Sequence, residues 1–299
     1  MSLHIVSHPD YDAKFPAGHR FPMGKYGALI KRLDMTGVLG ASVHVEAPLA
    51  EERALMRAHD AAYVDQVLSC NVPTTIEREI GFPVDDLVSR RARRAAGGTL
   101  LAARLAFAHG IACNAAGGSH HARQAQGAGF CTFNDVAVAA LDLLAERAEA
   151  RILVVDLDVH QGDGTANILA DEPRVFTFSM HAEKNYPARK EASTLDIGLP
   201  DRTGDERYLR ELRSALVRMA AEQWDLVFYN AGVDPHEDDR LGRLCLSDAG
   251  LRARDRMVIG TFREIGVPVC AVIGGGYSQD IAALAARHAI LFEVAAEFA

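Results

Sequence analysis

The sequence has little that would stabilise the chain covalently or place it in a membrane. Its 299 residues include five cysteines, and no two of them have the C-x-x-C spacing of a zinc ribbon or a thioredoxin-type dithiol. An odd number of scattered cysteines is typical of a reducing compartment. No apolar run approaches the roughly 20 residues of a membrane-spanning helix, and the first residues lack the basic and apolar segments of a signal peptide. We therefore expect a soluble, cytoplasmic protein that has no membrane partner.

Positive charge is also scarce. The chain has 32 lysine and arginine residues against 40 aspartate and glutamate residues, which gives a net charge of −8. A nucleic-acid partner attracts clustered basic residues, so this balance argues against one. It is compatible with a cationic substrate but does not identify it. The short basic run of Arg90, Arg91, Arg93 and Arg94 is interpreted as the solvated face of a helix, with an anion site or a subunit contact in a homo-oligomer as the alternative.

The chain lacks repeats, low-complexity segments and linkers rich in Pro, Ser or Gly, so we expect one domain over residues 1–299. Short apolar runs alternate with longer amphipathic ones, which predicts an α/β fold: a mostly parallel sheet with helices on both faces. The expected strands are 3–7, 111–114, 151–156, 175–179, 225–230 and 267–273. The expected helices are 86–108, 133–147, 206–221, 248–264 and 279–294.

Polar side chains follow several of these strands, at the edge where ligands bind in parallel sheets. Asp156, Asp158 and His160 alternate with apolar residues after the strand at 151–156, so in extended backbone they would share one face. Buried carboxylates and an imidazole need a cation to balance them, and this donor set suits Zn, Fe, Mn or Co. A salt-bridged cluster that only caps the strand is the alternative interpretation.

Three other strand ends carry residues suited to acid–base or electrostatic work. His120 and His121 follow two glycines, and histidine exchanges protons near neutral pH. Asp234 follows the strand at 225–230, and Tyr277 follows a run of three glycines, from which a phenol could donate to an oxyanion. Each has a structural alternative: incidental adjacent histidines, an Asp-Pro turn, and a tyrosine at the rim of a flexible loop.

Five motifs occur between about Gly18 and Tyr277, in the order GGSHH, GAGFCTFND, DLDVHQGDGT, YNAGVDPHEDDRLG and GGGY. Together they resemble the arginase/deacetylase superfamily, and within it the zinc-dependent histone deacetylases. HQGDG and NAGVD…DRLG are most similar to the class IV branch and its bacterial relatives. The resemblance implies a single open α/β domain around a mainly parallel sheet of about eight strands.

The resemblance implies a metal site formed by Asp158, His160 and Asp234. Zinc is the family's usual metal, and two carboxylates with one histidine could also accept Fe²⁺ or Co²⁺. Three protein ligands leave a coordination position for water and substrate. A monovalent cation, commonly potassium, is implied at a site built from Asp156, Asp158, His160, Ser179 and Met180.

The resemblance also implies the roles of the remaining polar residues in amide hydrolysis. His121 would act as general base and acid with His120 as electrostatic support, and Tyr277 would polarise the acyl carbonyl. Asp163 would hydrogen-bond to His121 and Asp156 to His120, which fixes the tautomer of each ring. The substrate would be an acetyl or longer fatty-acyl amide of lysine or of a related amine.

The substrate channel implied by the resemblance includes Gly129, Phe130 and Leu241. We expect the loops near residues 70–88 and 181–194 to line its entrance. Leu241 stands where polyamine-selective relatives carry glutamate, which favours acyl-lysine over a polyamine.

Other functions share these motifs and have to be distinguished. A deacylase of small polyamine-like amides and a catalytically silent acyl-binding sensor both remain as alternatives. A dimanganese ureohydrolase is disfavoured, because the strand at 225–230 leads only to Asn230 and Asp234, too few carboxylates for a second metal. Arg20 is a loose match to an arginine that lines the family's product channel, and the sequence leaves its role open.

Overall fold

The computed structural model describes residues 2–16 and 18–299. The strands of the described residues are β1 (His4–Ser7), β2 (Val43–Glu46), β3 (Ile111–Asn114), β4 (Ile152–Asp156), β5 (Val175–Ala182), β6 (Leu195–Leu199), β7 (Leu226–Ala231) and β8 (Val269–Ile273). They form one eight-stranded sheet in the order β2-β1-β3-β8-β7-β4-β5-β6, and every neighbouring pair is parallel. The expected open α/β fold is confirmed.

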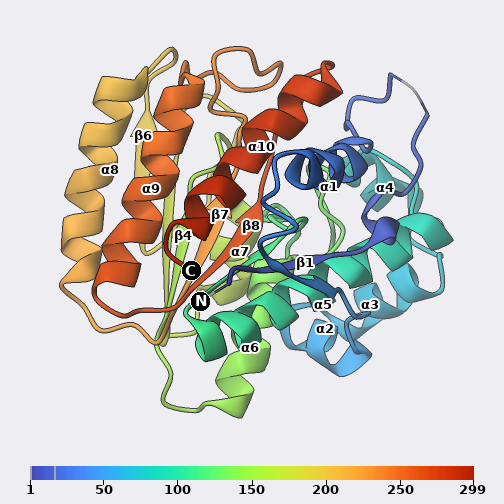
Figure 1. Ribbon diagram of the computed structural model, residues 1–299. Helices are drawn as coiled ribbons and strands as arrows, with labels where there is room; N and C mark the ends of the chain where they lie inside the picture. The colour runs from blue at the N-terminus through green and yellow to red at the C-terminus, as the bar shows by residue number, and fades with distance from the viewer. Residues whose placement is uncertain (1, 17) are drawn as a thin grey trace.

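Helices cover both faces of this sheet. Those of the described residues are η1 (Pro9–Tyr11, a 3-10 turn), α1 (Lys25–Met35), α2 (Glu52–Ala58), α3 (Ala61–Leu68), α4 (Thr74–Ile80), α5 (Asp86–His109), α6 (Asp135–Glu146), α7 (Asp163–Leu169), α8 (Asp205–Ala220), α9 (Asp248–Glu264) and α10 (Ile281–Ala296). On one face α1, α10, α9 and α8 pack side by side, and on the other α5 packs with α6, which α2 joins (Figure 1).

The central strands lie where the sequence predicts them because they are apolar along most of their length. β4, β7 and β8 are buried at every residue, as expected for strands covered by helices on both faces. β2 and β6 are not among the predicted strands, because both are short edge strands whose patterns, VHVE and LDIGL, are interrupted by polar residues and glycine. β5 continues past its predicted end at residue 179 as far as Ala182.

Helix prediction depends on the length of the amphipathic pattern. α8 begins and ends within one residue of its prediction, and its apolar stripe buries Tyr208, Leu212 and Leu216. The helices α2, α3 and α4 have only seven or eight residues each, too few for a clear helical period. α1 is longer but is also not among the predicted helices.

The basic run on α5 is mostly not a solvated face. Arg91 is buried and donates to a backbone carbonyl and to the hydroxyl group of a tyrosine. Arg93 and Arg94 donate to backbone carbonyls of the segment 47–50. Of the four arginines only Arg90 is exposed, so the interpretation as a solvated face is correct for Arg90 alone. The others fasten the N-terminal third of the chain to α5.

The five cysteines are free, as their spacing predicts. Cys113, Cys131 and Cys270 are buried, and burial raises the pKa of each thiol. They therefore act as small apolar side chains in the core. Within the described ranges, no helix combines the length and the apolarity needed to cross a membrane.

Gly97 tests how closely α5 packs on the preceding loop. A Cβ added to Gly97 would lie 2.2 Å from the carbonyl oxygen of Pro48, whereas one added to Gly27 on α1 would meet nothing within 4 Å. We expect Gly97→Ala to lower the free energy of unfolding by about 1–3 kcal/mol, because the two backbones must separate. Gly27→Ala should raise it by about 0.5–1 kcal/mol. Urea denaturation followed by circular dichroism measures both, and an unchanged stability of Gly97→Ala would contradict this packing.

Candidate active site

Four neighbouring strands bring the predicted site residues to one edge of the sheet. β3, β8, β7 and β4 are adjacent and parallel, so the segments that follow them meet at their carboxyl ends. Residues that lie far apart in the sequence therefore share one site. The segments carry His120 and His121 after β3, Tyr277 after β8, Asp234 after β7, and Asp158 and His160 after β4.

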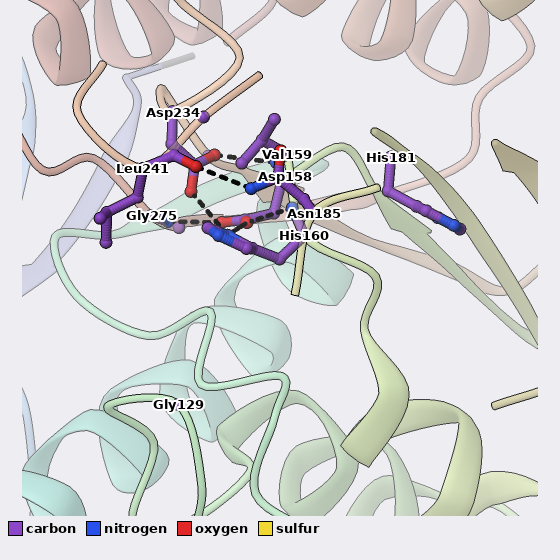
Figure 2. A network of polar contacts seen from close by, with 12 residues as sticks. Gly129, Asp158, Val159, His160, His181, Asn185, Asp234, Leu241 and Gly275 are labelled. Atoms are coloured by element: carbon purple, nitrogen blue, oxygen red, sulfur yellow. Dashed lines mark hydrogen bonds and ion pairs between the residues drawn. The ribbon is translucent and has the colours of Figure 1, made fainter. Parts of the chain in front are cut away.

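Asp158, His160 and Asp234 form a buried cluster (Figure 2). One ligand atom of each lies within 4.8 Å of the others, and Nδ1 of His160 is 3.0 Å from Asp158 Oδ1 and 3.2 Å from Asp234 Oδ2. Backbone amides hold the carboxylates: Gly275 donates to Asp158 at 2.6 Å, and Val159 donates to Asp234 at 2.8 Å. Among the described residues no group donates a hydrogen bond to the buried Oδ2 of Asp234, so this oxygen can bind a cation.

The charges of this cluster favour a bound cation. Burial, together with the charge of Asp158, raises the pKa of Asp234 to about 7. Burial alone would lower the pKa of His160, but its close contacts with both carboxylates and their charges outweigh burial and raise it to about 10. Without a metal, His160 therefore keeps a proton between the two carboxylates. A divalent metal ion would have to displace this proton in order to bind. Two carboxylates and an imidazole suit zinc, iron or cobalt, so the residues fit the metal that the resemblance implies.

Asp156 does not join this cluster, although the alternating pattern places it on the same face. β4 ends at Asp156, and the strict alternation ends with the strand. Oδ2 of Asp156 lies 2.7 Å from Nδ1 of His120, and Oδ1 accepts a hydrogen bond from Asn230 at 2.9 Å. Asp156 thus contacts His120, as the family resemblance implies, and His120 in turn lies 3.7 Å from Asp158.

The adjacent histidines face each other through their Nε2 atoms, which are 3.1 Å apart. Each Nδ1 faces a carboxylate: that of His120 faces Asp156 at 2.7 Å, and that of His121 faces Asp163 at 2.6 Å. An N–H···N hydrogen bond needs one donor and one acceptor, so the two Nε2 atoms share one proton. Burial opposes charge on both rings. The charges of Asp156 and Asp158 nevertheless raise the pKa of His120 to about 9, whereas burial and the charge of His120 lower the pKa of His121 to about 4. His121 is therefore the ring that can accept a proton.

A glycine-rich turn after β8 brings Tyr277 over the cluster. A Cβ on Gly275 in this turn would lie 1.9 Å from Oδ2 of Asp234, so only glycine fits between the backbone and the carboxylate. The ring centroid of Tyr277 is 6.0 Å from that of His160. Burial raises the pKa of Tyr277 well above its usual range, so the phenol remains a proton donor.

A cavity of about 320 Å³ leads from these residues to the surface. Phe130 and Tyr186 line it, and the Tyr186 ring packs edge-on against His121 with centroids 4.8 Å apart. Gly129 has a φ of +54°, and a Cβ there would lie 2.5 Å from the His121 ring, so a glycine is required beside Phe130. Leu241 also lines the cavity. Tyr186 was not predicted individually; its signal is an aromatic residue just after β5, one of the strands that end at this edge.

Comparison with known proteins identifies the arrangement. The family model of the histone deacetylase domain matches residues 19–292. The chain belongs to the histone deacetylase family. It is 44% identical to an uncharacterized protein of Picosynechococcus sp. over 99% of both chains, and 32% identical to Histone deacetylase 2 of Arabidopsis thaliana over 93% of this chain and 75% of that protein. The HDA15 HD domain shares its fold, with a TM-score of 0.84 over 99% of this chain and 89% of the other at 23% identity.

This histone deacetylase domain has a smaller cavity of about 20 Å³ beyond the site. Its lining includes two buried cationic side chains, Lys25 and Arg91. Lys25 donates to the carbonyl oxygen of Gly274 at 3.1 Å, and burial lowers its pKa to about 8. Arg20, the loose match to a product-channel arginine, is exposed at the outer cavity instead. The sequence did not reveal Lys25, because it begins α1, a helix that was not predicted.

Of the residues implied for a monovalent cation, Asp156 ends β4, Ser179 and Met180 lie on the neighbouring strand β5, and Asp158 and His160 follow β4. Ser179 on β5 pairs with Asp156 on β4, and its Oγ is 3.0 Å from Nδ1 of His181. Met180 is buried in β5. Figure 2 shows His181 directed away from the metal cluster. A monovalent cation site at these residues stays a prediction.

Gln161 fastens the loop that carries Tyr186. The Gln161 side chain donates to the carbonyl oxygen of Glu191 at 2.7 Å and to Asp196 at 2.8 Å, and it accepts from the backbone amide of Glu191 at 2.9 Å. Gln161 is buried and directly follows His160. The loop over the cavity is therefore tied to the segment that carries Asp158 and His160.

Gln161→Leu should loosen this loop without unfolding the domain. Leucine has a similar size but makes none of the three hydrogen bonds, so we expect a loss of stability of about 1–3 kcal/mol. Hydrogen exchange should become faster in residues 183–194 and stay unchanged in β4 and β7. Gln223→Leu, at an exposed glutamine, is the matched control. Equal exchange in Gln161→Leu and the wild type would show that the loop is held by other contacts.

Proposed function

We propose that this domain is a metal-dependent amide hydrolase that removes an acyl group from lysine or a related amine. The proposal is carried by three groups that meet at the base of one cavity: the cluster of Asp158, His160 and Asp234, the histidine pair, and Tyr277. Membership of the histone deacetylase family supports it. Held by the cluster, a zinc ion would supply Lewis-acid polarisation of the acyl carbonyl and of the attacking water.

The two histidines have different roles in the reaction. The attacking water takes the place of His120 as the donor to Nε2 of His121, which then accepts its proton, while Asp163 accepts a hydrogen bond from Nδ1–H of His121 and keeps this tautomer. His120, held in its charged form by Asp156, lies beside the reacting centre and stabilises the negative charge that develops there. The proton on His121 then passes to the leaving nitrogen, and the amine and the carboxylic acid separate.

Tyr277 donates a hydrogen bond to the oxyanion that forms from the carbonyl oxygen. The nearby walls, formed by Gly129, Phe130, Tyr186 and Leu241, carry no charge, which suits the aliphatic stem of an acyl-lysine. The inner cavity of about 20 Å³ holds little more than one water molecule. We therefore favour an acetyl or another short acyl group over a long fatty-acyl chain.

The residues of the proposed site are spread over much of the chain. Side chains that follow β3, β4, β7 and β8 form one site, so we propose that residues 1–299 act as one catalytic domain. A potassium ion beside the site would be held by oxygen atoms of the segment from Asp156 to His160 and of Ser179 and Met180. Such an ion would offset part of the buried negative charge.

Tyr277→Phe tests the role of the phenol. The variant keeps the aromatic ring but loses one oxyanion donor, a change that typically lowers kcat about 10²–10³-fold. We expect this loss on a fluorogenic acetyl-lysine substrate, with zinc content and thermal stability unchanged. Turnover like that of the wild type would remove Tyr277 from the mechanism. A wild-type protein that binds metal but hydrolyses none of a series of acyl-lysines would instead indicate an acyl-binding sensor.

Asp234→Asn tests the metal cluster independently of activity. The wild type should bind one zinc ion per chain, measured by atomic emission after dialysis, and lose it to a chelator. The amide replaces an anionic ligand with a neutral one, so we expect its zinc content to fall well below one per chain. Asp171→Asn, at an exposed aspartate, should bind zinc normally. A content near two ions per chain would favour a binuclear site.

A further inference from the structure

Two arginines stand at the mouth of the 320 Å³ cavity. Arg20 lies in the segment before α1, and Arg78 lies on α4, so two separate parts of the chain contribute them. Both side chains are exposed, and neither forms an ion pair or a hydrogen bond within residues 2–16 and 18–299. Glu79 is the acidic residue near them in the outer lining. The outer wall of the cavity thus carries more positive than negative charge.

The free guanidinium groups at the mouth differ from two arginines elsewhere in the domain that form ion pairs. Arg123 is bound to Asp163 at 2.8 Å, and Arg254 to Asp255 at 2.8 Å. A further unpaired arginine, Arg240, lines the neighbouring cavity, which shares Arg20 with the mouth. These arginines gather in a protein whose net charge is −8, so the positive mouth is a local exception to the overall charge.

The mouth and the proposed reacting groups lie at opposite ends of the same cavity. The inner end of the same cavity is formed by His121, His160 and Tyr277, and its middle by Phe130 and Tyr186. An acyl-amine with its amide at the inner end would run along the aromatic walls, and the far end of its amine half would reach the arginines. A carboxylate there would gain two cationic partners, whereas an ammonium group would be repelled.

We infer that Arg20 and Arg78 form a subsite for an anionic group on the amine half of the substrate. The preferred substrate class is then an acyl-lysine that carries a carboxylate close to the acylated side chain. That carboxylate can belong to the lysine itself or to an acidic neighbour in a peptide. Polycationic peptides and acylated polyamines are disfavoured. This inference rests on the proposed amide hydrolysis and adds to it the charge of the substrate.

A series of substrates with one acyl-aminoalkyl stem tests the subsite. It comprises Nα-capped Nε-acetyl-lysine with a free carboxylate, its neutral carboxamide, an acetylated polyamine, and acetyl-lysine peptides flanked by Asp or by Lys. We expect kcat/KM of the zinc-loaded wild type to be about three- to tenfold higher for the carboxylate than for the carboxamide, in keeping with the modest strength of exposed ion pairs. The polyamine should be the poorest substrate. The difference should shrink at about 1 M salt, where charges are screened within about 3 Å.

Charge-reversal variants locate the effect. The double variant Arg20→Glu and Arg78→Glu should abolish or invert the preference for the carboxylate while it still hydrolyses the neutral carboxamide. Arg213→Glu, at an exposed arginine on α8, changes net charge in the same sense and should keep the preference. A response to the Asp-flanked peptide alone would assign the anion to a peptide neighbour, and a response to the free acid alone would assign it to the lysine carboxylate; either supports the subsite.

The results that contradict the inference are distinct from those that contradict the function. Equal kcat/KM within both pairs, the carboxylate against the carboxamide and the Asp-flanked against the Lys-flanked peptide, or a preference that survives the double variant, would overturn the subsite and leave the hydrolase activity intact. Absence of turnover for every member of the series by zinc-loaded wild type would overturn the proposed function, and the subsite with it.

Discussion

Two buried carboxylates at neighbouring strand ends are the constraint on which the rest of the site depends. Asp158 and Asp234 lie at the ends of β4 and β7, and negative charge in such a place is costly unless it is balanced. Backbone amides and the His160 ring provide part of the balance, and a cation held by the cluster would provide the rest. The backbone of the neighbouring turns lies so close to these carboxylates that it has no room for side chains. A Cβ on Gly232, for example, would lie 2.6 Å from Oδ2 of Asp158. The glycines of this region are therefore a packing requirement of the charged cluster.

The same negative charge makes the two histidines unequal. His120 lies between Asp156 and the cluster, whereas His121 is paired with Asp163, whose charge Arg123 partly offsets. One ring is thus held charged and the other neutral, although they are adjacent in the sequence and equally buried. An acid–base pair needs this division of roles. It arises from the position of the neighbouring carboxylates and not from any difference between the rings.

The sequence predicts the parts of the fold in which local pattern and burial agree. The buried strands β4, β7 and β8 are apolar almost throughout, and the polar residues that follow them identify the edge where the site lies. The edge strands β2 and β6 and the short helices before α5 lack such patterns. Lys25, Tyr186 and the partners of Gln161 are recognisable only when distant segments are brought together. The pairing of Asp156 with His120 also joins two distant segments, and the alternating pattern around Asp156 carries no signal of it.

The net charge of the protein and the local charge at the cavity point to different substrates. The net charge of −8 describes the whole surface and is compatible with a cationic substrate. Screening limits each surface charge to a range of about 10 Å at about 0.1 M salt, so a substrate in the cavity responds mainly to the side chains around it. Those side chains are uncharged along the walls and include Arg20 and Arg78 at the mouth. The local charge at the mouth therefore favours an anionic group on the substrate, whereas the overall charge alone would favour a cationic one.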